Sequence, residues 1–271
     1  MEVLLAWQVA KLLVSVGIVL GLSLVAERIS TRVAGLLSGY PLGTAVALFF
    51  IGLEIGPGFA ADSAVYTLAG FTATLALGAG YLLCGRRDGL AGVLSGSAGG
   101  LICWLAVSAA LASVDFTRVS GSLTTLVAIA LFSALYRRIP ERRTSARGAF
   151  SWSALIFRAA LAAAIIFLIT GLAHVLPPAW AGLLSAFPVT FFPFLVILHL
   201  GHGAAPTATV IKHYPAGLGS LLSYALCVSL TYPVWGLALG TLAGFGVATL
   251  WLVVWTRLRA LLAPTSLVRQ T

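Results

Sequence analysis

The sequence predicts an all-α polytopic membrane protein of nine transmembrane helices in a 4+1+4 inverted-topology repeat. Three observations predict this fold. Of the 271 residues, 60% are hydrophobic and 8% are charged, whereas a soluble domain carries about 25% charged residues. The apolar runs are continuous, and each approaches the roughly 20 residues that span a bilayer. In addition, one eight-residue stretch occurs twice, 147 residues apart.

The spanning elements are predicted to be helices, because lipid leaves backbone polar groups without partners in anything except helices and closed barrels. The strands of a barrel would be short and would alternate in hydrophobicity, unlike these continuous runs. The predicted helices cover residues 3–25, 34–55, 62–84, 89–113, 119–136, 153–173, 180–200, 209–231 and 234–256. Because no cleavage site follows the first run, we expect it to be retained rather than removed as a signal peptide.

The distribution of basic residues predicts the orientation. The net charge is +9, but the basic residues stand in short loops beside apolar runs, which is typical of a topology signal and not of nucleic-acid binding. Nine helices place Arg118 on one face and twelve arginines on the other. The twelve are Arg28, Arg32, Arg86, Arg87, Arg137, Arg138, Arg142, Arg143, Arg147, Arg257, Arg259 and Arg269. Their face is predicted to be cytoplasmic, with the N-terminus outside and the C-terminus inside a bacterial-type inner membrane.

The repeated stretch is Ala34–Pro41, which returns as Ala181–Pro188. The same offset pairs Gly89–Ala91 with Gly236–Ala238 without a gap. An odd number of helices separates equivalent positions, so the halves are expected to lie inverted, as in many secondary transporters. The chain then divides into a first four-helix repeat (1–113), a linking helix with a basic cytoplasmic loop (114–147), a second repeat (148–260) and a cytoplasmic tail (261–271).

Each half also resembles the small four-helix GlpM-type inner-membrane proteins. The resemblance rests on the repeated stretch with its proline, on the segments Leu53–Gly56 and Leu198–His202 that end the following helix, and on Cys103–Trp104. It implies a duplicated and fused version of such a module. The predicted arrangement is also similar to that of drug/metabolite-type transporters, in which small inverted four-helix units pair or fuse.

Prolines near the start of two equivalent helices mark the candidate substrate site. Pro41 lies in one helix and Pro188 in the other, and proline breaks or kinks a helix because it lacks the N–H group. Helices interrupted at equivalent places in two halves are typical of transporter binding sites. The hydroxyls of Ser38 and Ser185 would satisfy the opened backbone or bind a polar ligand. The alternative is that these prolines only shape helix packing.

Two basic residues inside predicted helices, Lys11 and Arg158, also lie 147 residues apart. A charged side chain in the membrane costs about 2.5–3.5 kcal/mol on insertion scales, so the pair is expected to face a cavity that accepts an anionic group. The alternative is that both side chains extend to the membrane surface. Glu54 would pair with Lys11 as a gate or a proton-coupling carboxylate, or else is an exposed loop residue.

Four further polar residues, His199, His202, Lys212 and His213, are predicted to form a cytoplasmic polar rim. Two histidines without a further ligand nearby do not make a metal-site pattern, and we expect no metal. The chain has no nucleotide-binding or hydrolase motif, so we expect neither a cofactor nor enzymatic activity.

Glycines recur at every fourth position of two predicted helices, a spacing that lets helices approach closely in lipid. They are Gly92, Gly96 and Gly100 in one helix and Gly236, Gly240 and Gly244 in the other. We expect these faces to pack within the chain or to form a homodimer.

Together these features predict a secondary transporter or flippase-like carrier, which moves a small, anionic substrate or a lipid by alternating access. The alternative is a non-transporting structural or accessory inner-membrane protein of envelope assembly. The sequence does not name the substrate.

Overall fold

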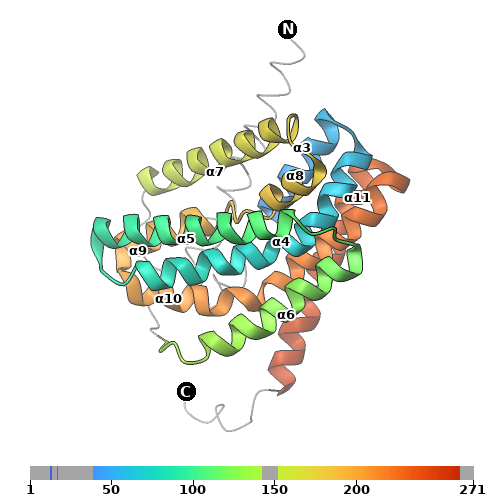
Figure 1. Ribbon diagram of the computed structural model, residues 1–271. Coiled ribbons are helices and arrows are strands. Elements are labelled where there is room, and N and C mark those ends of the chain that lie inside the picture. The colour runs from blue at the N-terminus through green and yellow to red at the C-terminus, as the bar shows by residue number, and fades with distance from the viewer. Residues whose placement is uncertain (1–12, 14–16, 18–38, 142–151, 263–271) are drawn as a thin grey trace.

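The computed structural model describes residues 13, 17, 39–141 and 152–262. All regular elements in these ranges are helices (Figure 1). Four of them are long and apolar enough to cross a membrane: Pro57–Cys84, Gly89–Ala112, Arg118–Tyr136 and Leu218–Leu258. The prediction of an all-helical membrane protein is therefore confirmed at this level. The predicted helix 3–25 lies outside the described residues except for two positions.

The first part of the described chain follows the predicted elements closely except at the start of α3, because residues 39–41, predicted as part of helix 34–55, are not helical. It forms α3 (Leu42–Glu54), α4 (Pro57–Cys84), α5 (Gly89–Ala112), α6 (Arg118–Tyr136) and α7 (Trp152–Ala173). Helix α4 begins five residues before the predicted residue 62, at Pro57. Proline suits the first position of a helix because the first N–H groups have no partner within the helix.

The second part differs from the prediction, because two helices expected to be continuous are interrupted. Residues 180–200 were predicted as one helix but form α8 (Pro178–Ser185) and α9 (Phe191–His202). Residues 209–231 were also predicted as one helix. They instead belong to α10 (Ala204–His213), the 3₁₀ turn η1 (Tyr214–Ala216) and the start of α11 (Leu218–Leu262).

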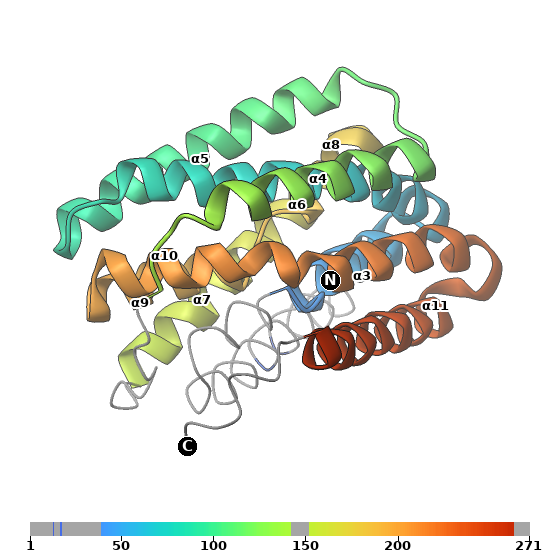
Figure 2. The same cartoon turned by 90° about the horizontal axis from the view of Figure 1, so that it is seen from below.

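Helix α11 is a hairpin of two helical limbs, since Gly236 inside it has φ 73° and ψ 179°. Figures 1 and 2 show the chain turning back there. The second limb packs along the first: the Ser220 hydroxyl donates to the Ala248 carbonyl at 3.2 Å, and Gly240 lies against the Tyr232 ring. The limbs correspond to the predicted helices 209–231 and 234–256.

Helix α4 forms the centre of the described fold and packs against α3, α5, α6, α8 and α11. The glycines of α5 make one of these contacts close. Gly96 lies against Tyr81 and Gly85, and Gly100 lies against Leu77. In the described part of the chain, these glycines therefore face α4 of the same molecule.

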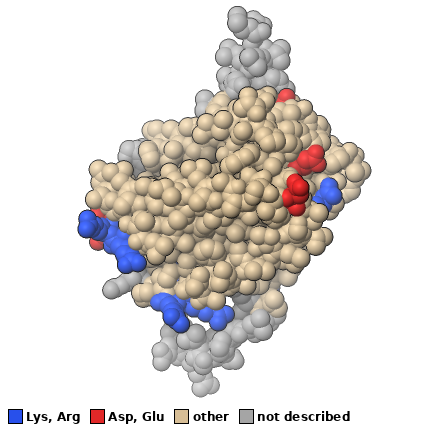
Figure 3. Space-filling view, viewed as in Figure 1, with Lys and Arg blue, Asp and Glu red and all other residues tan. Residues whose placement is uncertain are grey.

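The outer helices α5, α6 and α11 expose large apolar side chains. Ile102, Val127 and Leu242 are each about two-thirds exposed, at 65%, 66% and 67%. An apolar surface of this extent is unfavourable in water, so these side chains indicate contact with lipid. In Figure 3 a broad uncharged area separates the mostly basic charged side chains at the left and lower edges from a group toward the right, where Asp and Glu lie beside a basic side chain.

The contact between α8 and α4 allows a test of this packing. A methyl group on Gly182 would overlap the Ser63 carbonyl group of α4, so Gly182→Ala should destabilise the protein by about 1–3 kcal/mol. The measurement is the thermal unfolding midpoint in detergent. Gly171→Ala in α7 is the matched control, because a methyl group there meets no atom of the described residues within 4 Å. Equal midpoints for the two variants would contradict the described contact.

Candidate functional site

A small cavity lies where three non-helical segments meet. Its volume is about 10 Å³, close to the space that one water molecule needs. The first segment, residues 39–41, precedes α3, the second separates α8 from α9, and the third separates α10 from α11. The lining residues are Tyr40, Gly43, Thr44, Ala186, Phe187, Pro188, Val189, Thr190, Tyr214 and Leu221.

The prolines predicted to break helices lie at this junction. Pro41 is the residue directly before α3, and Pro188 lies in the non-helical segment between α8 and α9 and lines the cavity. Pro193 stands in the first turn of α9, where the missing N–H group removes no bond within the helix. Pro188 thus lies at a break between two helices and Pro41 at the start of a third, and the segments that contain them line one cavity.

Two close contacts in the fold involve residues that are related by the 147-residue offset. A side chain at Gly39 would collide with the backbone of Gly217, and a side chain at Gly70 would collide with Ala186. Ala186 is 147 residues after Gly39, and Gly217 is 147 residues after Gly70. The contact between Gly39 and Gly217 is therefore the counterpart of the contact between Ala186 and Gly70. Two halves related by a two-fold axis would make such a pair of contacts.

The backbone geometry repeats with the same offset. The positive φ angles among the described residues occur at Gly56 (142°) and Gly203 (83°), and at Gly89 (76°) and Gly236 (73°). The members of each pair are 147 residues apart. Since only glycine adopts such angles at low cost, the two halves start equivalent helices with equivalent turns.

Two threonines, which sequence reasoning missed, bring free hydroxyl groups to the cavity. Thr44 in the first turn of α3 is 3% exposed, and Thr190 is the residue directly before α9. Neither hydroxyl forms a hydrogen bond within the described part of the chain. The available signal was their position, three residues after Pro41 and two after Pro188.

Two other threonines satisfy the end of the interrupted helix α8. The Thr67 hydroxyl of α4 donates to the Gly182 carbonyl at 2.9 Å, and the Thr74 hydroxyl donates to the Ala186 carbonyl at 2.6 Å. These bonds have the role that the sequence suggested for Ser185. The Ser185 hydroxyl instead donates to the Ala181 carbonyl of its own helix at 2.8 Å.

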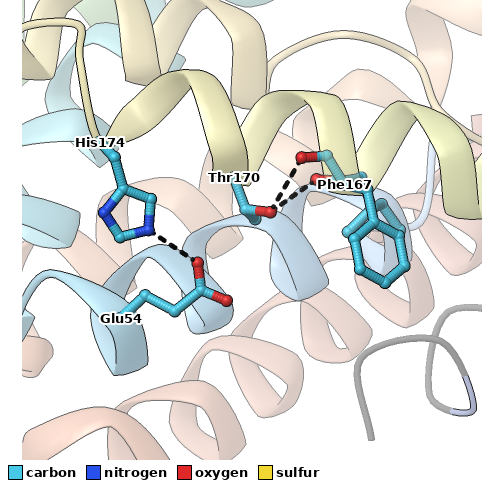
Figure 4. A network of polar contacts seen from close by, with 5 residues as sticks. Glu54, Phe167, Thr170 and His174 are labelled. Carbon is cyan, nitrogen blue, oxygen red and sulfur yellow. Dashed lines mark hydrogen bonds and ion pairs between the residues drawn. The ribbon is translucent and has the colours of Figure 1, made fainter. Parts of the chain in front are cut away.

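The predicted cationic pair and Ser38 are not placed at this cavity by the structure. Lys11 and Ser38 lie outside the described residues, as does the side chain of Arg158 in α7. Glu54, at the end of α3, lies 3.1 Å from Nε2 of His174 beyond the end of α7. Figure 4 shows the carboxylate facing this imidazole, so Glu54 has a partner that the sequence did not suggest.

His199, one of the four residues of the predicted polar rim, lies inside the protein. Its side chain is completely buried, and Nε2 lies 2.9 Å from the Arg87 carbonyl oxygen. That nitrogen must be the donor, because a carbonyl oxygen only accepts. Nδ1 of the neutral ring then accepts from the Tyr81 hydroxyl at 3.0 Å. His199 thereby joins α9 to α4 and to the loop between α4 and α5, whereas His202 is exposed.

A hydrogen bond near His199 also connects the loop before α5 to the turn after α9. Oδ1 of Asp88 accepts from the backbone N–H of Ala204, the first residue of α10, at 2.7 Å. A carboxylate at this end of a helix is favoured by the exposed N–H groups and the helix dipole. The loop before α5 is therefore fixed to the turn between α9 and α10.

The other two predicted rim residues contact the segment that follows α6. Nζ of Lys212 donates to the Ile139 carbonyl at 2.6 Å and lies 3.5 Å from the Glu141 carboxylate. Nε2 of His213 lies 3.2 Å from the same carboxylate. These contacts attach α10 to the start of the basic loop.

Among the described residues, no group of three or more His, Cys, Asp or Glu is arranged to hold a metal ion. No protein-family model, curated protein or solved structure matches this chain.

The hydrogen bonds of His199 to Tyr81 and Arg87 can be tested by substitution. His199→Phe should fill the same space but leave the Tyr81 hydroxyl and the Arg87 carbonyl without partners, at a cost of about 1–3 kcal/mol each. The thermal unfolding midpoint should fall accordingly. His202→Phe, three residues along the same helix and exposed, should leave the midpoint nearly unchanged. A similar midpoint for both variants would show that the buried bonds do not stabilise the fold.

Proposed function

We propose that this protein is a secondary transporter that moves a small substrate by alternating access, with the substrate site at the junction of its interrupted helices. One observation carries the proposal: non-helical segments at equivalent places, directly before α3 and between α8 and α9, line the same cavity. Interrupted helices that meet in this way are typical of secondary transporters, where freed backbone groups bind the substrate.

The proposal includes nine membrane spans in a 4+1+4 inverted repeat of the bacterial-type inner membrane. The exchange of contacts between Gly39–Gly217 and Gly70–Ala186 supports a two-fold relation between the halves. The paired glycine φ angles support it independently. A duplicated GlpM-type module would have this organisation.

Alternating access follows from such symmetry. When two halves have the same fold but lie inverted, each can adopt the conformation of the other, and this exchange moves the opening from one membrane face to the opposite one. The close contacts at Gly39 and Gly70 would act as the surfaces on which the halves move. The substrate would bind between them, beside Thr44 and Thr190.

Cysteine labelling tests access without knowledge of the substrate. The three native cysteines, Cys84, Cys103 and Cys227, are free and are first replaced by alanine. Thr44→Cys and Thr190→Cys are then introduced separately, and the protein is reconstituted in liposomes of known orientation. A membrane-impermeant maleimide applied on either side should label each new cysteine, because the site opens to both faces in turn.

Ala47→Cys, on the same helix and fully buried, is the matched control and should remain unlabelled. If neither cavity position is labelled from either side, the transport proposal fails. The protein would then fit a structural or accessory role in envelope assembly.

The orientation can be tested separately with reporter fusions. In the basic segment 137–147, a reporter that works only in the cytoplasm should be active, and a reporter that works only outside it should be inactive. That segment carries five of the arginines, and positive loops stay inside. A reporter after residue 115 should give the opposite result. Identical signals at both sites would overturn the inverted arrangement.

A further inference from the structure

The cavity faces the N-terminal ends of two helices, α3 and α9. In α3 the Leu42 N–H bonds to the Tyr40 carbonyl, and the Ala45 N–H bonds to the Pro41 carbonyl. The N–H groups of Gly43 and Thr44 between them have no backbone partner among the described residues. Both residues line the cavity. Thr190, directly before α9, lines it from the opposite side.

The carbonyl groups at the junction, in contrast, already have donors. Thr67 and Thr74 cap the C-terminal end of α8, and the Phe192 N–H bonds to the Pro188 carbonyl. A cation would need such oxygens as ligands, and among the lining residues there is no Asp or Glu. The unsatisfied groups at the cavity are therefore mainly donors, which suit an anion.

Thr44 provides a second, independent indication of a ligand. Its side chain is almost completely buried, lines the cavity and forms no hydrogen bond within the described part of the chain. A hydroxyl that lines a cavity without a protein partner can donate its hydrogen to whatever occupies the cavity. The hydroxyl is thus placed to complete a set of donors around one small ion.

Charge and volume limit the kind of ion. A helix N-terminus carries about half an elementary charge, and the free N–H groups of Gly43 and Thr44 at the start of α3 favour a small negative charge in the cavity. The volume of about 10 Å³ suits one sphere near the size of water better than a tetrahedral oxyanion. We propose that the cavity binds a single compact monovalent anion of about the size of chloride, as the substrate of the proposed transporter.

Chloride is the probe for a direct test on the purified full-length chain. Chloride replaces gluconate at constant sodium concentration and ionic strength, and the thermal unfolding midpoint is measured at each step. A bound ion stabilises the folded state in a saturable manner, so the midpoint should rise to a plateau and give a dissociation constant. Sulfate at the same ionic strength should not produce this saturable shift.

The side-chain role is tested with variants of equal size. Thr44→Val removes the hydroxyl while keeping the shape, and should weaken chloride binding about tenfold or more, as expected for one lost hydrogen bond to a charged group. Thr44→Ser should restore most of the affinity. Thr190→Val is a second variant for the case that Thr44→Val does not fold. Thr124→Val is the control, because that hydroxyl bonds only within α6, to the Ser120 carbonyl.

The outcomes separate this inference from the proposed function on which it rests. If wild-type protein shows no saturable chloride shift, or if Thr44→Val and Thr190→Val both retain it, the anion site is wrong. Labelling of the cavity cysteines from both faces would in that case still support a carrier of another substrate. Chloride binding without labelling would support the anion site and overturn transport.

Discussion

The structure depends on one constraint, which is that backbone groups freed by an interrupted helix need hydrogen-bond partners away from water. An unsatisfied group in lipid costs several kcal/mol. Two threonines of α4 meet this requirement by donating to the carbonyls of Gly182 and Ala186. Because these bonds fix the end of α8, the chain can separate α8 from α9 inside the protein. The central helix thus supports the interruption as well as the packing of its neighbours.

The same constraint gives the cavity its polarity. Hydroxyl groups satisfy the carbonyl end of α8, whereas the N–H groups of Gly43 and Thr44 at the start of α3 keep no backbone partner among the described residues, and both residues line the cavity. Farther out, polar bonds fix the loops instead of filling the centre. His199 and Asp88 hold the loop before α5, and Glu141 holds α10. The outer loops are thus held in place around the small polar cavity. A movement of the helices that line the cavity would therefore change its access to the two membrane faces.

Much of the fold could be predicted from sequence, and the reasons are local. Long apolar runs locate α4, α5 and α6 within a few residues, because lipid demands continuous apolar helices of a fixed length. Pro41 and Pro188 indicate the interruptions, since proline cannot donate a helical hydrogen bond. The interruption at Tyr214–Ala216 was missed, although Pro215 lies within it. His199 was placed on a rim because a histidine near a helix end gives no local sign of burial.

The sequence by itself determined the membrane environment, the approximate extents of α4, α5 and α6 and the 147-residue repeat, because each can be read from composition or from the residues themselves. Only the tertiary structure decided which donors and acceptors meet. Thr67 and Gly182 are 115 residues apart, and nothing local pairs them. Thr44 and Thr190 become neighbours of one cavity only when two distant interruptions converge. A hydrogen bond needs its two atoms within about 3 Å in space, whatever their separation along the chain. The polarity of the site could therefore be known only from the tertiary structure.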